Sequence, residues 1–301
     1  MTPNAPESRR TGVLYGLAAY GWWGLAVIYF KAVAHVPPLE VLAQRVVWSV
    51  PLLFGLLALR GRLGEVRAVL RDRRTLAILF LTTLLIGSNW LIYITAVTTG
   101  HILQSSLGYY INPLVNVMLG MAALGERLRP AQWASVLLAA AGVLYLAFSY
   151  GRPPWFALSL AATFALYGLL RKTVRAEGSV GLTVETSLML PAALVFLLVQ
   201  ATQGRPAFGH VSLQTDLLLL ASGLMTAMPL VWFANAIRRL PLTTMGFLQY
   251  LSPTLQFLLA VAVYGEPFTR AHLVTFGCIW AALALYSVDA ALAARRTRGL
   301  P

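Results

Sequence analysis

The sequence predicts an all-α polytopic membrane protein with ten transmembrane helices, arranged as two inverted five-helix repeats. Three observations predict this class. Hydrophobic residues make up 58% of the chain and charged residues 11%, whereas soluble domains carry about 25% charged residues. Motifs recur at an offset of 140 residues. Lysine and arginine are concentrated in every second segment between the apolar stretches.

The apolar stretches are too long for the core of a soluble protein of 301 residues. Residues 75–125 contain no Asp, Glu, Lys or Arg, and two crossings of about 20 residues each plus a turn account for such a run. No segment alternates with period two for long enough to predict a β-barrel. The predicted spans are 11–34, 39–59, 75–98, 101–124, 130–149, 154–173, 181–200, 214–237, 241–264 and 270–290.

Residues 11–150 and 151–290 are predicted to be two copies of one five-span unit. Because each copy has an odd number of spans, the second copy has to insert in the opposite sense. The glycine of the Gly-Glu motif is a predicted helix C-cap, and its glutamate is expected to fix the corner to the next helix. The recurring motifs are Gly125-Glu126 as Gly265-Glu266, Tyr110-x-x-Pro113 as Tyr250-x-x-Pro253, and Pro51 as Pro191.

The distribution of Lys and Arg predicts which segments lie in the cytoplasm. Eighteen of these residues fall in one alternating set of segments, which includes both tails (1–10 and 291–301), and four fall in the opposite set. Positively charged segments stay in the cytoplasm, so both termini are predicted to be cytoplasmic. The link 60–74 carries six arginines and its counterpart 200–214 carries one, as inversion of the second copy predicts.

Two prolines near the middle of spans four and nine point to a central site. Pro113 and Pro253 would free the carbonyls of Tyr109 and Gln249, which lipid cannot satisfy. Polar side chains share the same helix faces, and their spacing favours the wall of a cavity. The alternative is a set of amides that tie neighbouring helices together. The two stripes are Ser105, Tyr109, Asn112 and Asn116 in one half, and Gln249, Ser252 and Gln256 in the other.

Aromatic and amide residues in other spans are further candidates for the cavity wall, with core packing as the alternative. Tyr20 and Trp23 lie about ten residues into the first span, which is too deep for an interfacial belt. The remaining candidates are Asn89 and Tyr93 in span three, Tyr167 in span six, and Trp232 and Asn235 in span eight.

Two charged residues lie inside predicted spans at equivalent positions of the two copies, Arg45 and Glu185. A buried charge is costly unless it is paired or solvated, so both are candidates for gating or coupling; the alternative is snorkelling to the nearer surface. Inversion places them toward opposite faces, so no direct salt bridge is expected. We expect Arg45 to contact an anionic group or an outer gate, and Glu185 a cationic group, a proton or a cytoplasmic gate.

Residues nearer the span ends are expected to have simpler roles than the buried charges. Lys31 and Arg171 are expected to anchor their spans at the membrane surface. His101 is a candidate for titration in a gate. The single cysteine, Cys278, excludes an internal disulfide and a cysteine-based metal cluster.

The chain has no motif typical of an enzyme or of ATP hydrolysis. It contains neither a glycine-rich phosphate loop nor a metal-binding His-x-x-x-His pair, so no cofactor, metal or ATP site is expected. The positively charged residues that give the net charge of +13 lie between the apolar runs. Orientation of the chain in the membrane explains this placement better than nucleic-acid binding does. The expected partners are the lipid bilayer and a small-molecule solute. A non-transporting sensor or scaffold and an intramembrane enzyme are the alternatives.

Several motifs resemble the EamA-type branch of the drug/metabolite transporter superfamily, and within it the RarD group of chloramphenicol-sensitivity proteins. The resemblance covers residues 11–290 and implies an inner-membrane permease that exports small metabolites, amino acids or drugs. It also implies that spans one, three, four, six, eight and nine surround a central cavity. The motifs are Gly21-Trp22-Trp23-Gly24, Asn89-Trp90-Leu91-Ile92-Tyr93, Ser106-Leu107-Gly108-Tyr109-Tyr110-Ile111-Asn112-Pro113-Leu114, Gly125-Glu126-Arg127-Leu128 and Leu248-Gln249-Tyr250-Leu251-Ser252-Pro253-Thr254.

The expected mechanism is alternating access, in which the related halves rock about the central site. An amphipathic solute would stack on Trp and Tyr side chains while Asn112, Gln249 and the freed carbonyls bind its polar groups. The sequence leaves open the substrate, the direction of transport, the coupling ion and the oligomeric state.

Overall fold

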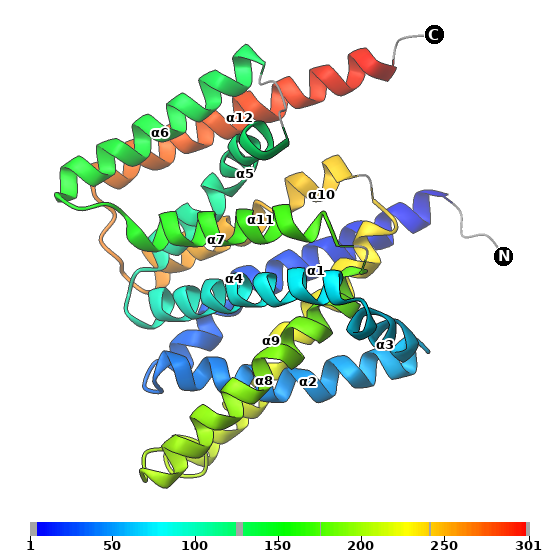
Figure 1. Cartoon of the computed structure of the whole chain (residues 1–301). Helices are drawn as coiled ribbons and strands as arrows, with labels where there is room; N and C mark the ends of the chain where they lie inside the picture. The colour runs from blue at the N-terminus through cyan, green and yellow to red at the C-terminus, as the bar shows by residue number, and fades with distance from the viewer. Residues whose placement is uncertain (1–4, 125–128, 175, 241, 299–301) are drawn as a thin grey trace.

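Every regular element in the computed structural model is a helix within the ranges whose backbone it describes, residues 5–124, 129–174, 176–240 and 242–298 (Figure 1). The first half contains α1 (Ala5–Ala32), α2 (Pro38–Leu59), α3 (Leu63–Arg71), α4 (Arg73–Thr98), α5 (Ile102–Leu124) and α6 (Pro130–Tyr150). The second half contains α7 (Trp155–Arg171), α8 (Gly178–Thr202), α9 (Leu213–Ile237), α10 (Leu242–Leu248), α11 (Leu251–Leu258), the π-helix η1 (Leu259–Val263) and α12 (Arg270–Arg298).

The long helices coincide with the apolar stretches of the sequence. Eight helical segments in the described ranges are long and apolar enough to cross a membrane. Helix α7 is apolar but has only 17 residues, a length of about 25 Å against a hydrocarbon core of about 30 Å. The all-helical membrane class is therefore confirmed, whereas the count of ten crossings and the inversion of the second half stay predictions.

Helix α3 lies in a segment that the sequence analysis treated only as an arginine-rich link. It is amphipathic: Val66 is buried in a cluster with Leu57 and Leu79, while its arginines are exposed. Asp72 ends α3 and caps α4, because its carboxylate accepts hydrogen bonds from the backbone N–H of Arg74 and Thr75. This short helix has few apolar residues, and they lie among arginines, so the sequence pattern is too weak to predict the helix.

The ninth predicted span is broken into three pieces. Pro253 has no N–H to donate to the carbonyl of Gln249 and its ring clashes with that carbonyl, so α10 ends in a turn at Gln249 and Tyr250 before α11 begins. Tyr250 N bonds the carbonyl of Phe247 instead (3.2 Å). In the other half Pro113 lies inside the continuous helix α5, so the two prolines have different effects on their helices.

Helices α6 and α12 pack side by side at the upper edge of the view in Figure 1. They approach closely at Gly142, where an added Cβ would lie 2.8 Å from the Cβ of Cys278. The Thr275 hydroxyl donates to the carbonyl of Gly142 (2.9 Å). This pair leaves the polar and charged candidates on the other helices, where α2 packs on α8 and α9, α5 on α7, and α1 on α9.

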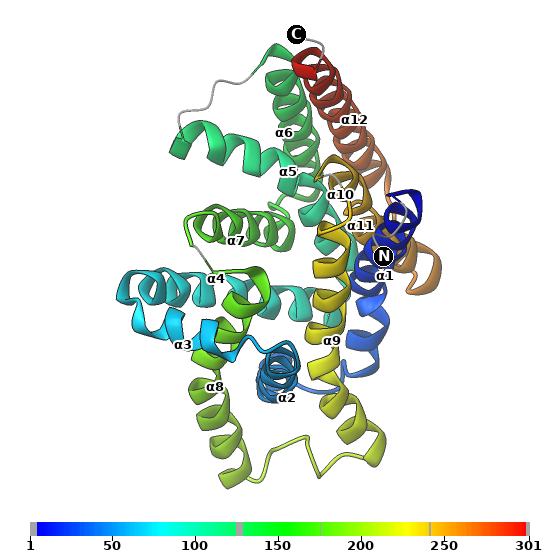
Figure 2. The same cartoon turned by 90° about the vertical axis from the view of Figure 1, so that its right-hand side faces the viewer.

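Both chain ends and α3 lie at the right-hand side of Figure 1, and the α4–α5, α6–α7 and α8–α9 connections lie at the left. Viewed from that right-hand side, α3, α10 and the start of α1 face the reader (Figure 2). The arginine-bearing helix α3 therefore lies at the same end of the bundle as α10 and the start of α1, and we call this end the arginine side. Its placement in the cytoplasm stays a prediction.

Two carboxylates, the buried Glu40 and the half-buried Glu266, hold the opposite end of the bundle together. Glu40 accepts hydrogen bonds from the backbone N–H of Ala207 (2.7 Å) and Phe208 (3.4 Å). Glu266 accepts from the first two N–H groups of α5, at Ile102 (2.6 Å) and Leu103 (2.8 Å), where free donors and the helix dipole favour a negative charge. Glu266 therefore ties the corner before α12 to the start of α5.

The preceding glycine of that motif behaves as predicted. Gly265 has a φ of 62°, the left-handed conformation that glycine adopts readily when it ends a helix. The first copy of the motif, Gly125-Glu126, lies outside the described residues.

Candidate functional site

Arg45 is buried inside the bundle, about 10 Å along α2 from the start of that helix. Its side chain is 7% exposed. Its Nε donates a hydrogen bond to the hydroxyl of Thr226 on α9 (2.8 Å). The guanidinium lies over the ring of Trp90, 4.1 Å from the ring centre, and 5.9 Å from that of Phe30. The guanidinium is thus held by a hydroxyl and by aromatic rings.

Glu185 occupies the matching position of α8 and is fully buried. Its carboxylate accepts hydrogen bonds from the hydroxyls of Thr82 (2.6 Å) and Tyr167 (3.2 Å). Its cationic partner is Arg171, whose Nε lies 3.8 Å away. A side chain at Gly181 would collide with the guanidinium of Arg171, so this glycine makes room for the ion pair.

The pairing of Arg171 with Glu185 differs from the expected surface anchor. Arg171 ends α7 and Glu185 lies in the second turn of α8. The short link between these helices brings them together. That link, together with a lone intramembrane acid, is the signal that could have found the pair. Arg45 and Glu185 are not in contact with one another through an ion pair, as the sequence analysis expected.

A continuous series of aromatic contacts connects the two charged residues. It starts at Phe30 beside Arg45 and ends at Tyr167, which donates to Glu185. The ring centres are 5.6 to 6.1 Å apart, which is typical of favourable aromatic pairs. We call this series the aromatic row; its members are Phe30 on α1, Tyr93 on α4, Tyr109 on α5, and Phe164 and Tyr167 on α7.

The side chains of the aromatic row differ in exposure. Tyr109 and Tyr167 are half-buried and Phe164 is exposed. Tyr93 is buried, and its hydroxyl has no hydrogen-bond partner. Tyr93, Tyr109 and Tyr167 were predicted from the sequence. Phe30, Phe164 and Trp90 were not, because nothing in the sequence distinguishes an aromatic residue that packs against other helices from one that faces lipid.

Predicted amides hold the helices of the aromatic row in register. Asn89 Nδ2 on α4 donates to the carbonyl of Leu160 on α7 (3.0 Å) and to the hydroxyl of Thr163 (2.9 Å). Asn112 Nδ2 on α5 donates to the carbonyl of Ala161 (3.2 Å). Asn116 Nδ2 donates to Asn112 Oδ1 (2.9 Å). These contacts use the amides of Asn89 and Asn112 to join α4 and α5 to α7.

The other predicted polar residues of spans four and nine connect α5 to α11. Ser105 Oγ donates to Gln256 Oε1 (3.2 Å), and Gln256 Nε2 donates to Ser252 Oγ (3.3 Å). All three are buried, so together they form an interhelical network. Gln249 is half-buried in the turn that Pro253 produces.

The equivalent tyrosines of the two copies also meet between these helices. The rings of Tyr110 and Tyr250 stack with their centres 6.4 Å apart. The Tyr110 hydroxyl bonds to that of Thr254 (2.7 Å).

A second aromatic cluster forms where α1 packs on α9. Tyr20 contacts Trp23 and Phe233, with ring centres 5.5 and 6.1 Å away. Trp22 contacts Trp232 (5.5 Å), and its buried Nε1 has no partner. Farther along α9, Asn235 Oδ1 accepts from Arg239 (3.1 Å). The predicted residues Tyr20, Trp23 and Trp232 thus share this interface, whereas Asn235 contacts Val231 and Arg239 of its own segment.

His101 lies at the opposite end of the bundle from α3. Its ring is 4.9 Å from that of Phe156, and its Nδ1 bonds the hydroxyl of Thr99 (3.0 Å). It lines a pocket with Gln104 and Glu266 at the start of α5. His101 is therefore separate from the aromatic row.

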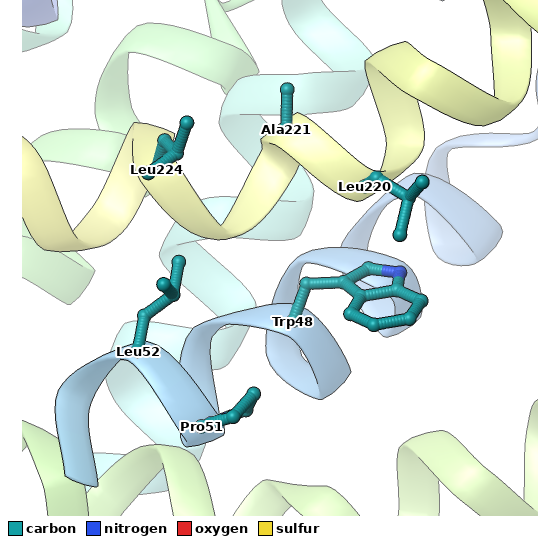
Figure 3. Close-up of a pocket in the computed structure, with 6 residues that line it drawn as sticks. All are labelled: Trp48, Pro51, Leu52, Leu220, Ala221 and Leu224. Carbon is teal, nitrogen blue, oxygen red and sulfur yellow. The ribbon is translucent and has the colours of Figure 1, made fainter. Parts of the chain in front are cut away.

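An apolar groove lies between α2 and α9 on the outside of the bundle (Figure 3). Its polar group is the indole N–H of Trp48, which donates to Gln44 Oε1 (2.9 Å). The groove offers nothing to bind the polar part of a solute. It is lined by Trp48, Pro51, Leu52, Leu220, Ala221 and Leu224.

A charged cluster joins the two halves at the arginine side. Arg62 forms ion pairs with Glu65 (2.6 Å) and with Glu177 at the start of α8 (2.6 Å). Glu177 also lies 3.5 Å from Arg238 at the end of α9. The hydrogen bond from Arg62 lowers the pKa of Glu177, and these carboxylates raise the pKa of Arg62.

Nothing in the described part of the chain forms a metal-binding group of three or more His, Cys, Asp or Glu side chains. The Arg45–Glu185 region offers opposite charges, hydroxyl donors and flat apolar faces.

Comparisons with known proteins place these features in a family context. The model of the EamA-like transporter family matches residues 10–148 and 153–288. An "Uncharacterized transporter" of Vibrio cholerae is 47% identical and covers 99% of both chains. "Protein RarD" of Salmonella typhi is 45% identical over 96% of this chain and 99% of its own. A "Crystal structure of protein" matches with a TM-score of 0.59 at 21% identity, over 92% of this chain and 97% of that one. The last match supports the fold alone.

Proposed function

Because this chain belongs to the EamA-like transporter family, we propose that it moves a small organic solute by alternating access around the Arg45–Glu185 region. The family and the apolar helices make it a multi-pass membrane transporter.

The observation that carries the proposal is the aromatic row with an opposite charge at each end. Side chains from α1, α4, α5 and α7 converge there, with α2 and α8 supplying Arg45 and Glu185. Flat rings bind the apolar part of a solute, and convergent polar groups fix its orientation. Tyr93, with its unpartnered buried hydroxyl, offers a donor in the same place.

The proposed architecture has ten crossings in two inverted copies, with both termini on the cytoplasmic side of a bacterial inner membrane. The 140-residue offset, the charge distribution and the shared arginine side of both termini and α3 support it. Cysteine labelling of single-cysteine variants from each face of inverted vesicles tests it. Labelling of the two termini from opposite faces would contradict the proposal.

We assign Glu185 to coupling or gating. It is a fully buried acid that contacts two hydroxyls and one cation, and such groups in membrane proteins serve proton or ion coupling. Glu185→Gln should therefore abolish or uncouple transport driven by a pH gradient. Unchanged pH-driven transport by that variant would remove this assignment.

Retention of labelled solutes in inverted membrane vesicles tests transport itself. We expect at least one amphipathic solute of a broad panel to accumulate only when the protein is present. Tyr109→Leu should weaken its uptake by up to about tenfold, the value of one aromatic contact. Phe148→Leu is the matched control, because Phe148 is 82% exposed on the outside of α6. Equal retention with and without the protein across the panel would overturn the proposed function.

A further inference from the structure

We propose that Arg45 and Tyr93 form an anion subsite that binds the carboxylate of the solute. The inference rests on the proposed function and names the substrate class of that site. The class comprises small molecules in which a carboxylate lies next to a flat apolar group.

Arg45 has no carboxylate partner among the side chains that the structure describes. Each of the eight acidic side chains that the structure describes is engaged elsewhere. Glu185 pairs with Arg171 and Glu177 with Arg62, while the others cap helices, hold loops or pair at the surface. The contacts are Glu40 with Ala207 and Phe208, Glu65 with Arg62, Asp72 with Arg74, Glu177 with Arg62, Glu185 with Thr82 and Arg171, Asp216 with Gly209, Glu266 with Ile102, and Asp289 with Arg129.

The guanidinium of Arg45 is only partly engaged. Thr226 occupies Nε, and Trp90 covers one face of the group. The two Nη atoms make no hydrogen bond to any residue that the structure describes. Two parallel N–H groups match the two oxygens of a carboxylate. Arg45 therefore keeps free the part of its side chain that recognises carboxylates.

The hydroxyl of Tyr93 is a second unpaired group. This side chain is 6% exposed and its hydroxyl has no partner, an arrangement that costs free energy unless something accepts the hydrogen bond. Tyr93 is near Arg45 through Phe30: the rings of Tyr93 and Phe30 have their centres 5.6 Å apart, and the guanidinium of Arg45 lies 5.9 Å from the ring centre of Phe30. An anion bound to Arg45 would satisfy both groups, and the aromatic row starts at the same place.

A purely structural role for Arg45 makes the opposite prediction about stability. Burial of a guanidinium without a carboxylate is unfavourable, and stacking on Trp90 offsets only part of that. If Arg45 is kept for binding, Arg45→Met should leave the ligand-free protein as stable as the wild type or more stable. If Arg45 is structural, the same change should lower its thermal midpoint.

Binding to the purified full chain in detergent tests the subsite without any need for transport. The probes are matched acid and amide pairs: benzoate with benzamide, and 3-phenylpropionate with 3-phenylpropanamide. Binding is measured by the shift in thermal midpoint and by the change in tryptophan fluorescence. At least one acid should bind while its amide does not. Arg45→Met should weaken that acid by about thirtyfold or more, and Tyr93→Phe by about tenfold. Arg205→Met, a change at an exposed loop residue, should bind like the wild type.

Several outcomes would overturn the subsite. They are the absence of acid binding across all pairs, equal binding of acid and amide, and unchanged binding in Arg45→Lys and Tyr93→Phe. Chloride that competes as well as the acids at equal concentration would assign the site to small inorganic ions and also overturn the proposal. Arg45→Lys keeps the charge and so remains informative if Arg45→Met does not fold.

Vesicle uptake separates this proposal from the proposed function. Arg45-dependent binding without uptake of the bound acid would leave the subsite standing and contradict transport. A different outcome would leave transport standing and contradict the subsite. In that outcome Arg45→Met takes up uncharged solutes as well as the wild type does, and the wild type does not prefer acids to amides.

Discussion

Replacement of Arg171 by methionine should expose how strongly the structure depends on the buried ion pair. The Glu185 carboxylate would keep two hydroxyl donors and lose the cation 3.8 Å away. At that distance two unit charges attract by about 4 kcal/mol in an effective dielectric constant of about 20. Removal of one partner from a buried pair typically costs about 3–5 kcal/mol. We therefore expect Arg171→Met to lower the free energy of unfolding by about 3–5 kcal/mol.

A double-mutant cycle isolates the pair from the loss of packing. In Arg171→Met/Glu185→Gln no charge remains to be left unpaired, so most of the lost stability should return, with a coupling energy of about 2–4 kcal/mol. Unfolding in mixed detergent micelles with increasing SDS measures all four proteins. Additive effects of the two changes, or a cost below about 1 kcal/mol for Arg171→Met, would refute an energetically coupled pair.

Three further predictions use the same unfolding assay or a close relative of it. Gly142→Val forces side-chain atoms into α12 and should cost about 1–3 kcal/mol, whereas Gly277→Val, in open space, should cost less; equal losses would contradict the packing argument. Glu266→Ala leaves the first N–H groups of α5 without their acceptor and should speed their hydrogen exchange, while unchanged exchange would contradict the cap. The depressed pKa of Glu177 means that its bridge to Arg62 stabilises the protein above a pH of about 4.3. That contribution should fall away as the pH drops through the lower folded-state pKa, and Glu177→Gln should lack this part of the acid dependence.

The long helices are predictable from the sequence because lipid requires long, uncharged, self-satisfied backbone segments. The missing N–H of Pro253 explains the turn before α11, but Pro113 lies inside a continuous helix, so the presence of a proline does not by itself predict a break. Helix α3 escaped prediction because its buried side chain, Val66, is surrounded by arginines that already explained the segment as a topological signal.

The candidate site was predicted in parts. Arg45 and Glu185 stand out because charges are rare inside spans, and the tyrosines because they lie deep within them. The ion pair of Glu185 with Arg171 depends on a gap at Gly181 that only the packed helices reveal. Phe30 was not identified because an aromatic residue in an apolar span gives the same pattern whether it faces a solute or a lipid tail.

The stacking of Tyr110 on Tyr250 carries a consequence for motion. These residues are equivalent at the 140-residue offset, so under the proposed alternating access an exchange of conformations between the two halves would turn their contact into the same contact. The contact of Glu266 with Ile102 joins residues that are not equivalent to one another, so it can form in one conformation and break in the other. A covalent cross-link at the tyrosine pair should consequently be tolerated throughout the transport cycle, while one that fastens Glu266 to the start of α5 should arrest it.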